Sequence, residues 1–139
     1  MSILLEVDDL KISARKDDDS LLPIVKGVSF KVARGEVVAL IGESGSGKTT
    51  IALSALGYTK PGLEFDGGEV RLEGEDVITM RSDHLRSLRG QRVAYLAQSA
   101  AATFNPALTI GEQVTESSVL HGILSKEQAH ERATVLYQA

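Results

Sequence analysis

A run of ten residues, IGESGSGKTT at positions 41–50, combines three glycines with several hydroxyl residues and a single lysine. Its core from Gly42 to Thr49 fits the pattern G-x-x-x-x-G-K-[ST], which is typical of loops that bind nucleotide phosphates. Glycines allow consecutive backbone N–H groups to curl around an anion, because a Cβ would obstruct that curl. A flexible loop that binds nothing is the alternative interpretation. A dinucleotide-binding loop is excluded, because G-x-G-x-x-G is not present here.

Each part of this loop has a predicted role. Lys48 adds a full positive charge that can reach the β- and γ-phosphates, and Thr49 offers a hydroxyl to Mg²⁺, which takes few protein ligands. The helix that begins near Lys48 directs the positive end of its dipole at the phosphates. The predicted nucleotide-binding residues are Gly42, Glu43, Ser44, Gly45, Ser46, Gly47, Lys48, Thr49 and Thr50.

Apolar runs on either side of the loop predict the elements that hold it. The run VVALI at 37–41 does not alternate in polarity, as expected for a central strand that is covered on both faces. Helical spacing follows over 48–57 and ends at Gly57, a plausible residue after a helix end. A second mostly apolar run, RVAYLAQ at 92–98, predicts another buried strand that ends at Gln98.

The remaining elements divide the chain into a strand-rich front and a helical end. Short apolar or alternating runs predict strands over 3–7, 28–32 and 67–74, and the polar run at 14–20 predicts a turn. Helices are predicted over 81–90, 109–122 and 125–139. Two of them begin with the spacing of a capping box, Thr109 with Glu112 and Ser125 with Gln128.

Composition excludes several classes of protein. The chain has 139 residues, of which 42% are hydrophobic and 24% are charged, as in a soluble globular protein. A net charge of −4 gives no support for a nucleic-acid partner. The absence of cysteine excludes disulfides and thiolate metal sites. There is no apolar run of the ~20 residues that span a bilayer, and MSILLEVDDL is not a signal peptide, so a cytoplasmic protein is predicted.

Two longer stretches carry a resemblance to a known family. GVSFKVARGEVVALIGESGSGKTT resembles the corresponding stretch of ABC transporter ATP-binding subunits, and AYLAQSAAATFNPALTIGEQV resembles their Q-loop region. The portion FNPALTIGEQV looks most like the peptide/nickel uptake branch, which includes oligopeptide and dipeptide importers. The resemblance runs from about Leu5 to the last residue.

The resemblance implies site residues, cofactors and partners. Gln98 would be the Q-loop glutamine, which contacts Mg²⁺ or the attacking water, so Lys48 and Gln98 are the expected catalytic residues and Thr49 and Gln98 the expected metal ligands. The cofactors would be ATP and Mg²⁺. The partners would be transmembrane permease subunits and a second ATP-binding subunit, on the inner face of the cell membrane. The family stacks adenine on an aromatic residue near the place that Ser13 and Ala14 occupy here.

The family's signature motif and its Asp-Glu strand end do not occur in this sequence, so we expect the N-terminal part of a longer subunit. The expected fold class is α/β: a RecA-like P-loop core with an antiparallel β subdomain over 1–108, and the start of a helical subdomain over 109–139. The expected function is an ATPase that energises uptake of peptides or a related small solute. The residues present would bind nucleotide without turnover. A soluble ABC-type ATPase without a membrane partner and a nucleotide-binding module without turnover remain as alternatives.

Overall fold

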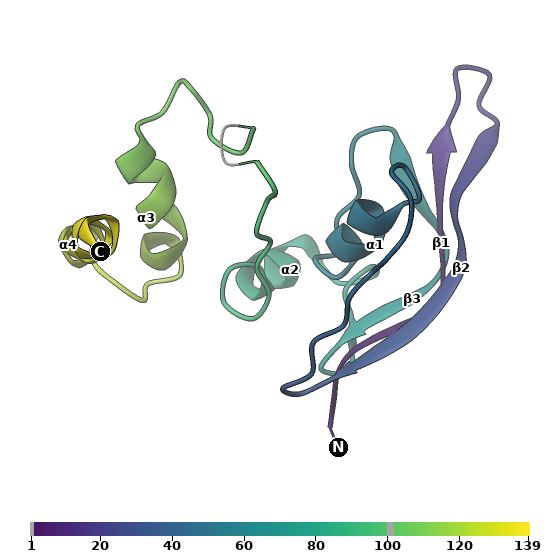
Figure 1. Ribbon diagram of the computed structural model, residues 1–139, viewed down its shortest axis with the longest axis horizontal. Helices are drawn as coiled ribbons and strands as arrows, with labels where there is room; N and C mark the ends of the chain where they lie inside the picture. The colour runs from purple at the N-terminus through teal and green to yellow at the C-terminus, as the bar shows by residue number, and fades with distance from the viewer. Residues whose placement is uncertain (1, 100–101) are drawn as a thin grey trace. The chain divides into compact units, whose positions relative to one another are not determined.

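The computed structural model describes residues 2–99 and 102–139 of the chain (Figure 1). These residues form two compact units, Met1–Arg86 and Ser87–Ala139. Among the described residues, the first unit carries the strands and the glycine-rich run, and about half of the second unit is helical.

The first unit is built on an antiparallel sheet of four strands in the order β2-β1-β3-β4. The strands are β1 (Ile3–Arg15), β2 (Leu21–Ala33), β3 (Leu63–Leu72) and β4 (Glu75–Asp76). The three strands predicted in the front of the chain are thus confirmed, but each is longer than its apolar pattern indicated. Cross-strand pairing extends β1 and β2 to the polar turn at 16–20, so the turn predicted over 14–20 is two residues shorter, and Ala14 and Arg15 belong to β1.

A bulge bends the middle of β1. The register of β1 shifts around Asp8 and Asp9, both in its pairing with β2 and in its pairing with β3. Asp9 has a φ of 45°. Gly68 of β3 lies directly beside it, with a φ of 81°, and a Cβ at Gly68 would lie 2.3 Å from the carbonyl oxygen of Asp9. Two backbones therefore approach at a distance that only glycine allows.

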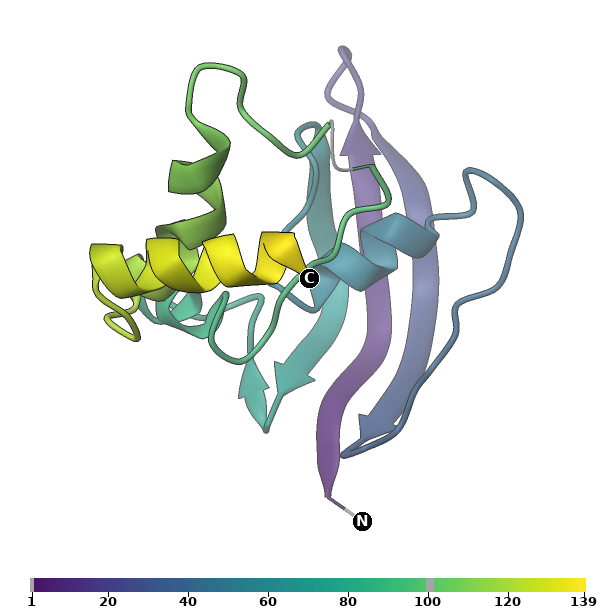
Figure 2. The same ribbon diagram turned by 60° about the vertical axis from the view of Figure 1, so that its left-hand side comes forward.

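One helix, α1 (Lys48–Ser54), lies against one face of this sheet (Figure 1 and Figure 2). Ile51 and Leu53 are its buried apolar side chains. The sheet contributes fully buried side chains from β1 and β3, namely Val7, Leu10, Ile12 and Val70. The predicted stop at Gly57 is confirmed, because the helix ends at Ser54 and Gly57 has a φ of 60°. A Cβ there would lie 2.4 Å from the carbonyl oxygen of Val77.

The two strands predicted for a central parallel sheet are wrong. Residues 37–41 form no strand, and Val37 and Ile41 are each 94% exposed. Residues 92–98 contain a single bridge, between Val93 and Arg89, and Leu96 is 96% exposed. A parallel strand requires a neighbouring strand for its hydrogen bonds and helices on both faces. The described residues provide neither for these two runs, so their apolar side chains remain exposed.

The helices at the end of the chain are close to those predicted. Helix α2 (Ser82–Leu88) spans the boundary between the units, and α3 (Ile110–Leu120) and α4 (Lys126–Gln138) lie in the second unit. Both predicted capping boxes are present: Thr109 and Glu112 cap α3, and Ser125 and Gln128 cap α4. Gly90, at the end of the helix predicted over 81–90, follows α2 with a φ of 84°.

Candidate phosphate-binding site

The glycine-rich run connects β2 to α1, and Gly47 fixes how closely the two elements approach. Gly47 is the N-cap of α1 and has a left-handed backbone, with φ 88° and ψ 7°. A Cβ at Gly47 would lie 3.4 Å from Cγ2 of Val25 and 3.8 Å from the carbonyl oxygen of Ile24. Glycine thus allows the helix to begin directly beside β2, with the run at 42–46 outside it.

Lys48, the first residue of α1, turns its side chain back into this run. Its ammonium group donates hydrogen bonds to the carbonyl oxygens of Gly42, at 2.8 Å, and Glu43, at 2.5 Å. A third bond of 3.3 Å reaches Oγ of Ser46. The run therefore closes around a positive charge, and such a charge can pair with phosphate oxygens once it leaves these carbonyl acceptors.

Backbone geometry gives the loop its curl. The Ser46 amide donates to the carbonyl oxygen of Glu43 at 3.2 Å, and Gly45, between them, has a φ of 81°. A Cβ at Gly42 would lie 2.8 Å from Oγ of Ser46, so this glycine also leaves room for the closure. Gly47 makes no side-chain cap, which leaves the first N–H groups of α1 without a side-chain acceptor. Such groups can donate to an anion held by the loop.

Other predicted site residues differ in their surroundings. Thr49 is exposed beside Lys48, whereas Thr50 is buried, with 9% of its surface accessible. Gln98 is exposed and belongs to the second unit, while the loop belongs to the first. The structure brings together the loop residues, including Lys48, within the first unit.

The structure adds a feature that the sequence pattern did not indicate. Ile24 and Val25 form the wall behind Gly47, and nothing in the local sequence marks β2 as the neighbour of the loop. Ser13 is also not an open position: it is 1% exposed and donates a hydrogen bond of 2.7 Å to Oδ2 of Asp66. The burial of Ser13 follows from the register of β1, and this register depends on the bulge at Asp9, which the sequence pattern did not indicate.

Comparison with known families shows to which family the chain belongs. A family model described as "ABC transporter" matches residues 25–138, which include the loop and its helix. The chain belongs to the ABC transporter family. The resemblance stated from the sequence is thereby confirmed.

Its relatives are ATP-binding proteins of peptide import systems. The chain is 39% identical over 139 residues to the oligopeptide transport ATP-binding protein AppD of Bacillus subtilis (strain 168). It is 41% identical over 133 residues to a putative peptide import ATP-binding protein of Brucella abortus (strain 2308). These alignments cover 99% and 96% of this chain but only 42% and 40% of the relatives, so this family member spans less than half of their length.

Solved structures of ABC cassettes share its fold. A dimeric bacterial ABC transporter cassette superposes with a TM-score of 0.77, at 22% identity, over 94% of this chain and 54% of the cassette. A post-hydrolysis form of that cassette, bound to ADP and Pi, gives the same values. At this identity the likeness shows the fold alone, and it confirms the predicted α/β fold class. Among the described residues, no helix is long and apolar enough to cross a membrane.

Proposed function

We propose that this ABC family member is the ATP-binding part of an ATPase subunit that energises uptake of peptides or a related small solute. The observation that carries the proposal is the closure of the loop at 42–47 around the Lys48 ammonium group at the start of α1. The substrate class is supported by relatives that are 36–41% identical and are named for peptide or oligopeptide transport.

In this proposal the loop grips the nucleotide through charge and backbone donors. The Lys48 ammonium leaves its carbonyl acceptors and pairs with the β- and γ-phosphates, where the charge-assisted bonds are stronger. The N–H groups of the loop and of the first turn of α1 donate to the remaining phosphate oxygens. These residues are Gly42 to Thr50, with Thr50 contributing its backbone because its side chain is buried.

The donor atoms present also suit Mg²⁺. The exposed hydroxyl of Thr49 is a hard oxygen ligand next to Lys48, and the amide oxygen of Gln98 is the second proposed ligand, as the family resemblance implies. Bound there, Mg²⁺ would neutralise charge on the phosphates during hydrolysis. Gln98 would orient the attacking water through its amide.

The subunit is further proposed to act with other chains. Transmembrane permease subunits and a second ATP-binding subunit are the proposed partners, at the inner face of the cell membrane. Residues 1–108 would form the β subdomain and P-loop core, and 109–139 the beginning of a helical subdomain.

A single substitution tests the site. Lys48→Ala is expected to weaken Mg-ATP binding by about 2 kcal/mol or more, because a charge-assisted contact to phosphate is lost. Calorimetric titration measures this loss. Lys60→Ala is the matched control, since Lys60 is an exposed lysine of the same unit outside the loop.

Equal affinities for wild-type protein, Lys48→Ala and Lys60→Ala would contradict the site. Equal weakening by the two substitutions would indicate a nonspecific effect of surface charge. Either result would remove the basis of the proposed function.

A further inference from the structure

The run that leads into the phosphate loop has the properties of a strand without a partner. Val37 and Ile41 are each 94% exposed. Val38 and Leu40 lie between them and are 40% and 37% exposed, which is the alternation of a strand with two faces. Among the described residues, no backbone N–H or carbonyl group of 37–41 has a hydrogen-bond partner. The run therefore presents apolar side chains together with backbone groups that could join a sheet.

Both ends of this run are fixed to neighbouring elements. At its start, the Glu36 amide donates to the carbonyl oxygen of Ala33 at 3.1 Å, and the Glu36 carboxylate accepts from the Ala33 amide at 2.6 Å. At its end, the carbonyl oxygen of Gly42 accepts from the Lys48 ammonium at 2.8 Å. Figure 2 shows the connection from β2 to α1 passing outside the strands of the sheet. Because its ends are held, the run loses little conformational entropy when another strand pairs with it.

The open edge of the sheet is protected against such pairing. β2 lies at this edge, since the strand order is β2-β1-β3-β4. Pro23 lacks the N–H group that a partner strand needs, and Lys26 and Lys31 place charges along β2. Proline and lysine are residues with which proteins blunt an exposed edge. The addition of another strand is therefore discouraged at β2.

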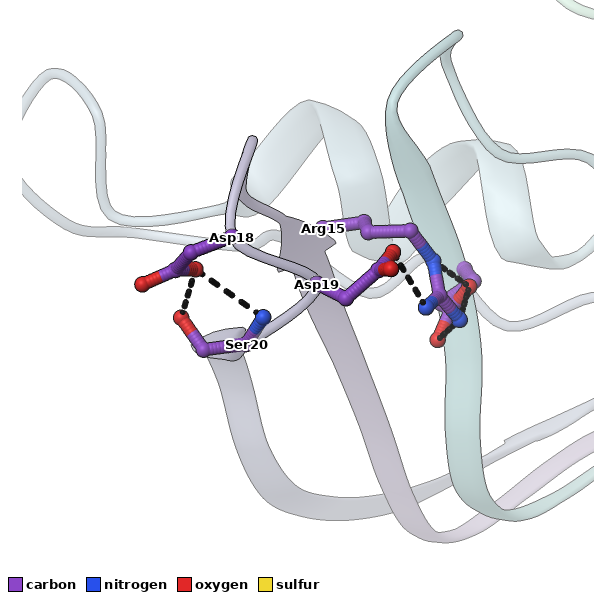
Figure 3. A network of polar contacts seen from close by, with 5 residues as sticks. Arg15, Asp18, Asp19 and Ser20 are labelled. Atoms are coloured by element: carbon purple, nitrogen blue, oxygen red, sulfur yellow. Dashed lines mark hydrogen bonds and ion pairs between the residues drawn. The ribbon is translucent and has the colours of Figure 1, made fainter.

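The hairpin end of β2 carries further charges (Figure 3). The Arg15 guanidinium donates to both carboxylate oxygens of Glu64 on β3, at 2.9 Å each, and to Asp19 in the turn at 3.4 Å. Asp18 accepts bonds from the Ser20 hydroxyl at 2.5 Å and the Ser20 amide at 3.0 Å. These charged groups are held at the start of β2, so they too discourage strand addition there.

The run at 37–41 suits antiparallel pairing with a second copy of itself. It contains neither proline nor a charged side chain. An antiparallel pairing centred on Ala39 brings paired residues to the same face. The side chains that are 94% exposed then meet each other, and so do those that are 40% and 37% exposed. The pairs formed are Val37 with Ile41 and Val38 with Leu40.

The charges that flank the run favour this register. Glu36 would lie opposite Gly42, and Glu43 would lie across from Gly35, so each carboxylate faces a residue without a side chain. A parallel pairing in register would instead place Glu36 opposite Glu36. Like charges that are directly opposite destabilise a strand pair. The charge pattern therefore selects the antiparallel arrangement.

We infer that this chain forms a two-fold dimer in which residues 37–41 of two copies pair as antiparallel strands. The contact uses the same patch on both copies, so it closes at two chains. It involves the run that precedes the phosphate loop and not a bound nucleotide, so the dimer forms without ATP. The contact is separate from the partners proposed above.

Paired charge variants test both the contact and its direction. Val37→Lys with Ile41→Glu places opposite charges in both cross-strand pairs, and this double variant should still dimerise. Val37→Lys with Ile41→Lys places like charges in the same pairs, and it should raise the dimer dissociation constant roughly tenfold or more. Sedimentation velocity over a concentration series, without nucleotide, measures both constants. Leu96→Lys is the control in the other exposed apolar run and should dimerise like wild-type protein, since Leu96 is 96% exposed and lies outside the contact.

A second measurement locates the contact and guards against a folding defect. In wild-type protein, the amides of 37–41 should gain protection from hydrogen exchange as the protein concentration rises, and in the variant with two lysines they should not. Circular dichroism should be the same for both double variants, because the replaced side chains are exposed.

Three outcomes would overturn the inference. A wild-type chain that stays monomeric across the micromolar range, or that forms open-ended assemblies, would exclude a closed dimer. Equal association of the two double variants would exclude antiparallel pairing of Val37 with Ile41. Loss of the dimer in Leu96→Lys would assign the contact to the run at 92–98.

Discussion

At the level of single residues, the phosphate loop depends on two neighbours with different roles, the charge of Lys48 and the left-handed backbone of Gly47. In the proposed site the charge attracts phosphate, and the backbone sets where that charge lies. A positive φ costs an L-residue about 1–2 kcal/mol, so Gly47 cannot be replaced without either strain or movement of the loop. These two roles can be separated by substitution.

Gly47→Ala should lose most ATP affinity, because relief of the strain at φ 88° moves the start of α1 away from Val25. Gly62→Ala is the control, with a φ of 84° in an open turn and nothing within 4 Å of the added Cβ. Thermal unfolding should show a similar stability loss of about 1–2 kcal/mol for both variants. Calorimetry should show weaker ATP binding for Gly47→Ala alone, and unchanged binding by this variant would mean that the loop does not need its left-handed start.

At the level of elements, the close approach of β1 and β3 has a clear test. Gly68→Ala should destabilise the first unit by roughly 2 kcal/mol or more, because its Cβ would meet backbone atoms of Asp9, which cannot rotate away. Gly74→Ala carries a similar φ of 88° but has open space around it. Chemical denaturation of both variants separates the loss of stability due to the clash from the loss due to a positive φ alone. Equal midpoints for the two would show that the bulge adjusts freely.

The capping box of α3 gives a second test at this level, and it depends on pH. The Thr109 hydroxyl and amide donate to Oε2 of Glu112, at 2.8 and 3.0 Å, and the bond from the Thr109 side chain lowers the pKa of this carboxyl. A lowered pKa means that the stabilisation is present above the usual carboxyl pKa and is lost as pH falls through the lowered value.

Thr109→Ala should therefore reduce the stability of α3 by about 1 kcal/mol at neutral pH. Hydrogen exchange of the amides in the first turn of α3 measures the change. In wild-type protein, acidification should lower the protection of these amides from exchange. Glu112→Gln should abolish this pH response, whereas Glu116→Gln, four residues further along the helix, should retain it. A pH response that persists in Glu112→Gln would assign it to another group.

At the level of the whole molecule, gripping a nucleotide and hydrolysing it require different groups. Hydrolysis needs a group that activates the attacking water by accepting its proton. It also needs added positive charge at the γ-phosphate. The amide of Gln98 can orient water but cannot act as a base. We expect the chain of 139 residues to bind Mg-ATP and to release phosphate no faster than buffer does.

A phosphate-release assay on the purified chain measures this directly, with Lys48→Ala as the control for contaminating enzymes. Turnover by the wild-type chain that disappears in Lys48→Ala would contradict the expectation. It would then require a catalytic carboxylate, and Glu43, exposed within the loop, would be the first to replace.

Local sequence determined much of this protein. The capping boxes at Thr109 and Ser125, the helix stop at Gly57 and the hairpin turn at 16–20 all depend on bonds or dihedral angles within a few residues, so their patterns predicted them. Phosphate binding by the run at 42–49 stays a prediction, and it too was read from a local pattern of glycine spacing and one lysine.

Only the tertiary structure decided which apolar runs become strands and which surfaces surround the loop. The runs at 37–41 and 92–98 look buried by composition, but a strand forms only where another strand offers its hydrogen bonds, and the described residues offer none there. Conversely, the bulge at Asp9 and the pairing of Leu22 with Ala14 arise from contacts between distant segments. Such contacts set faces and register, and a sequence pattern of period two cannot specify them across a bulge.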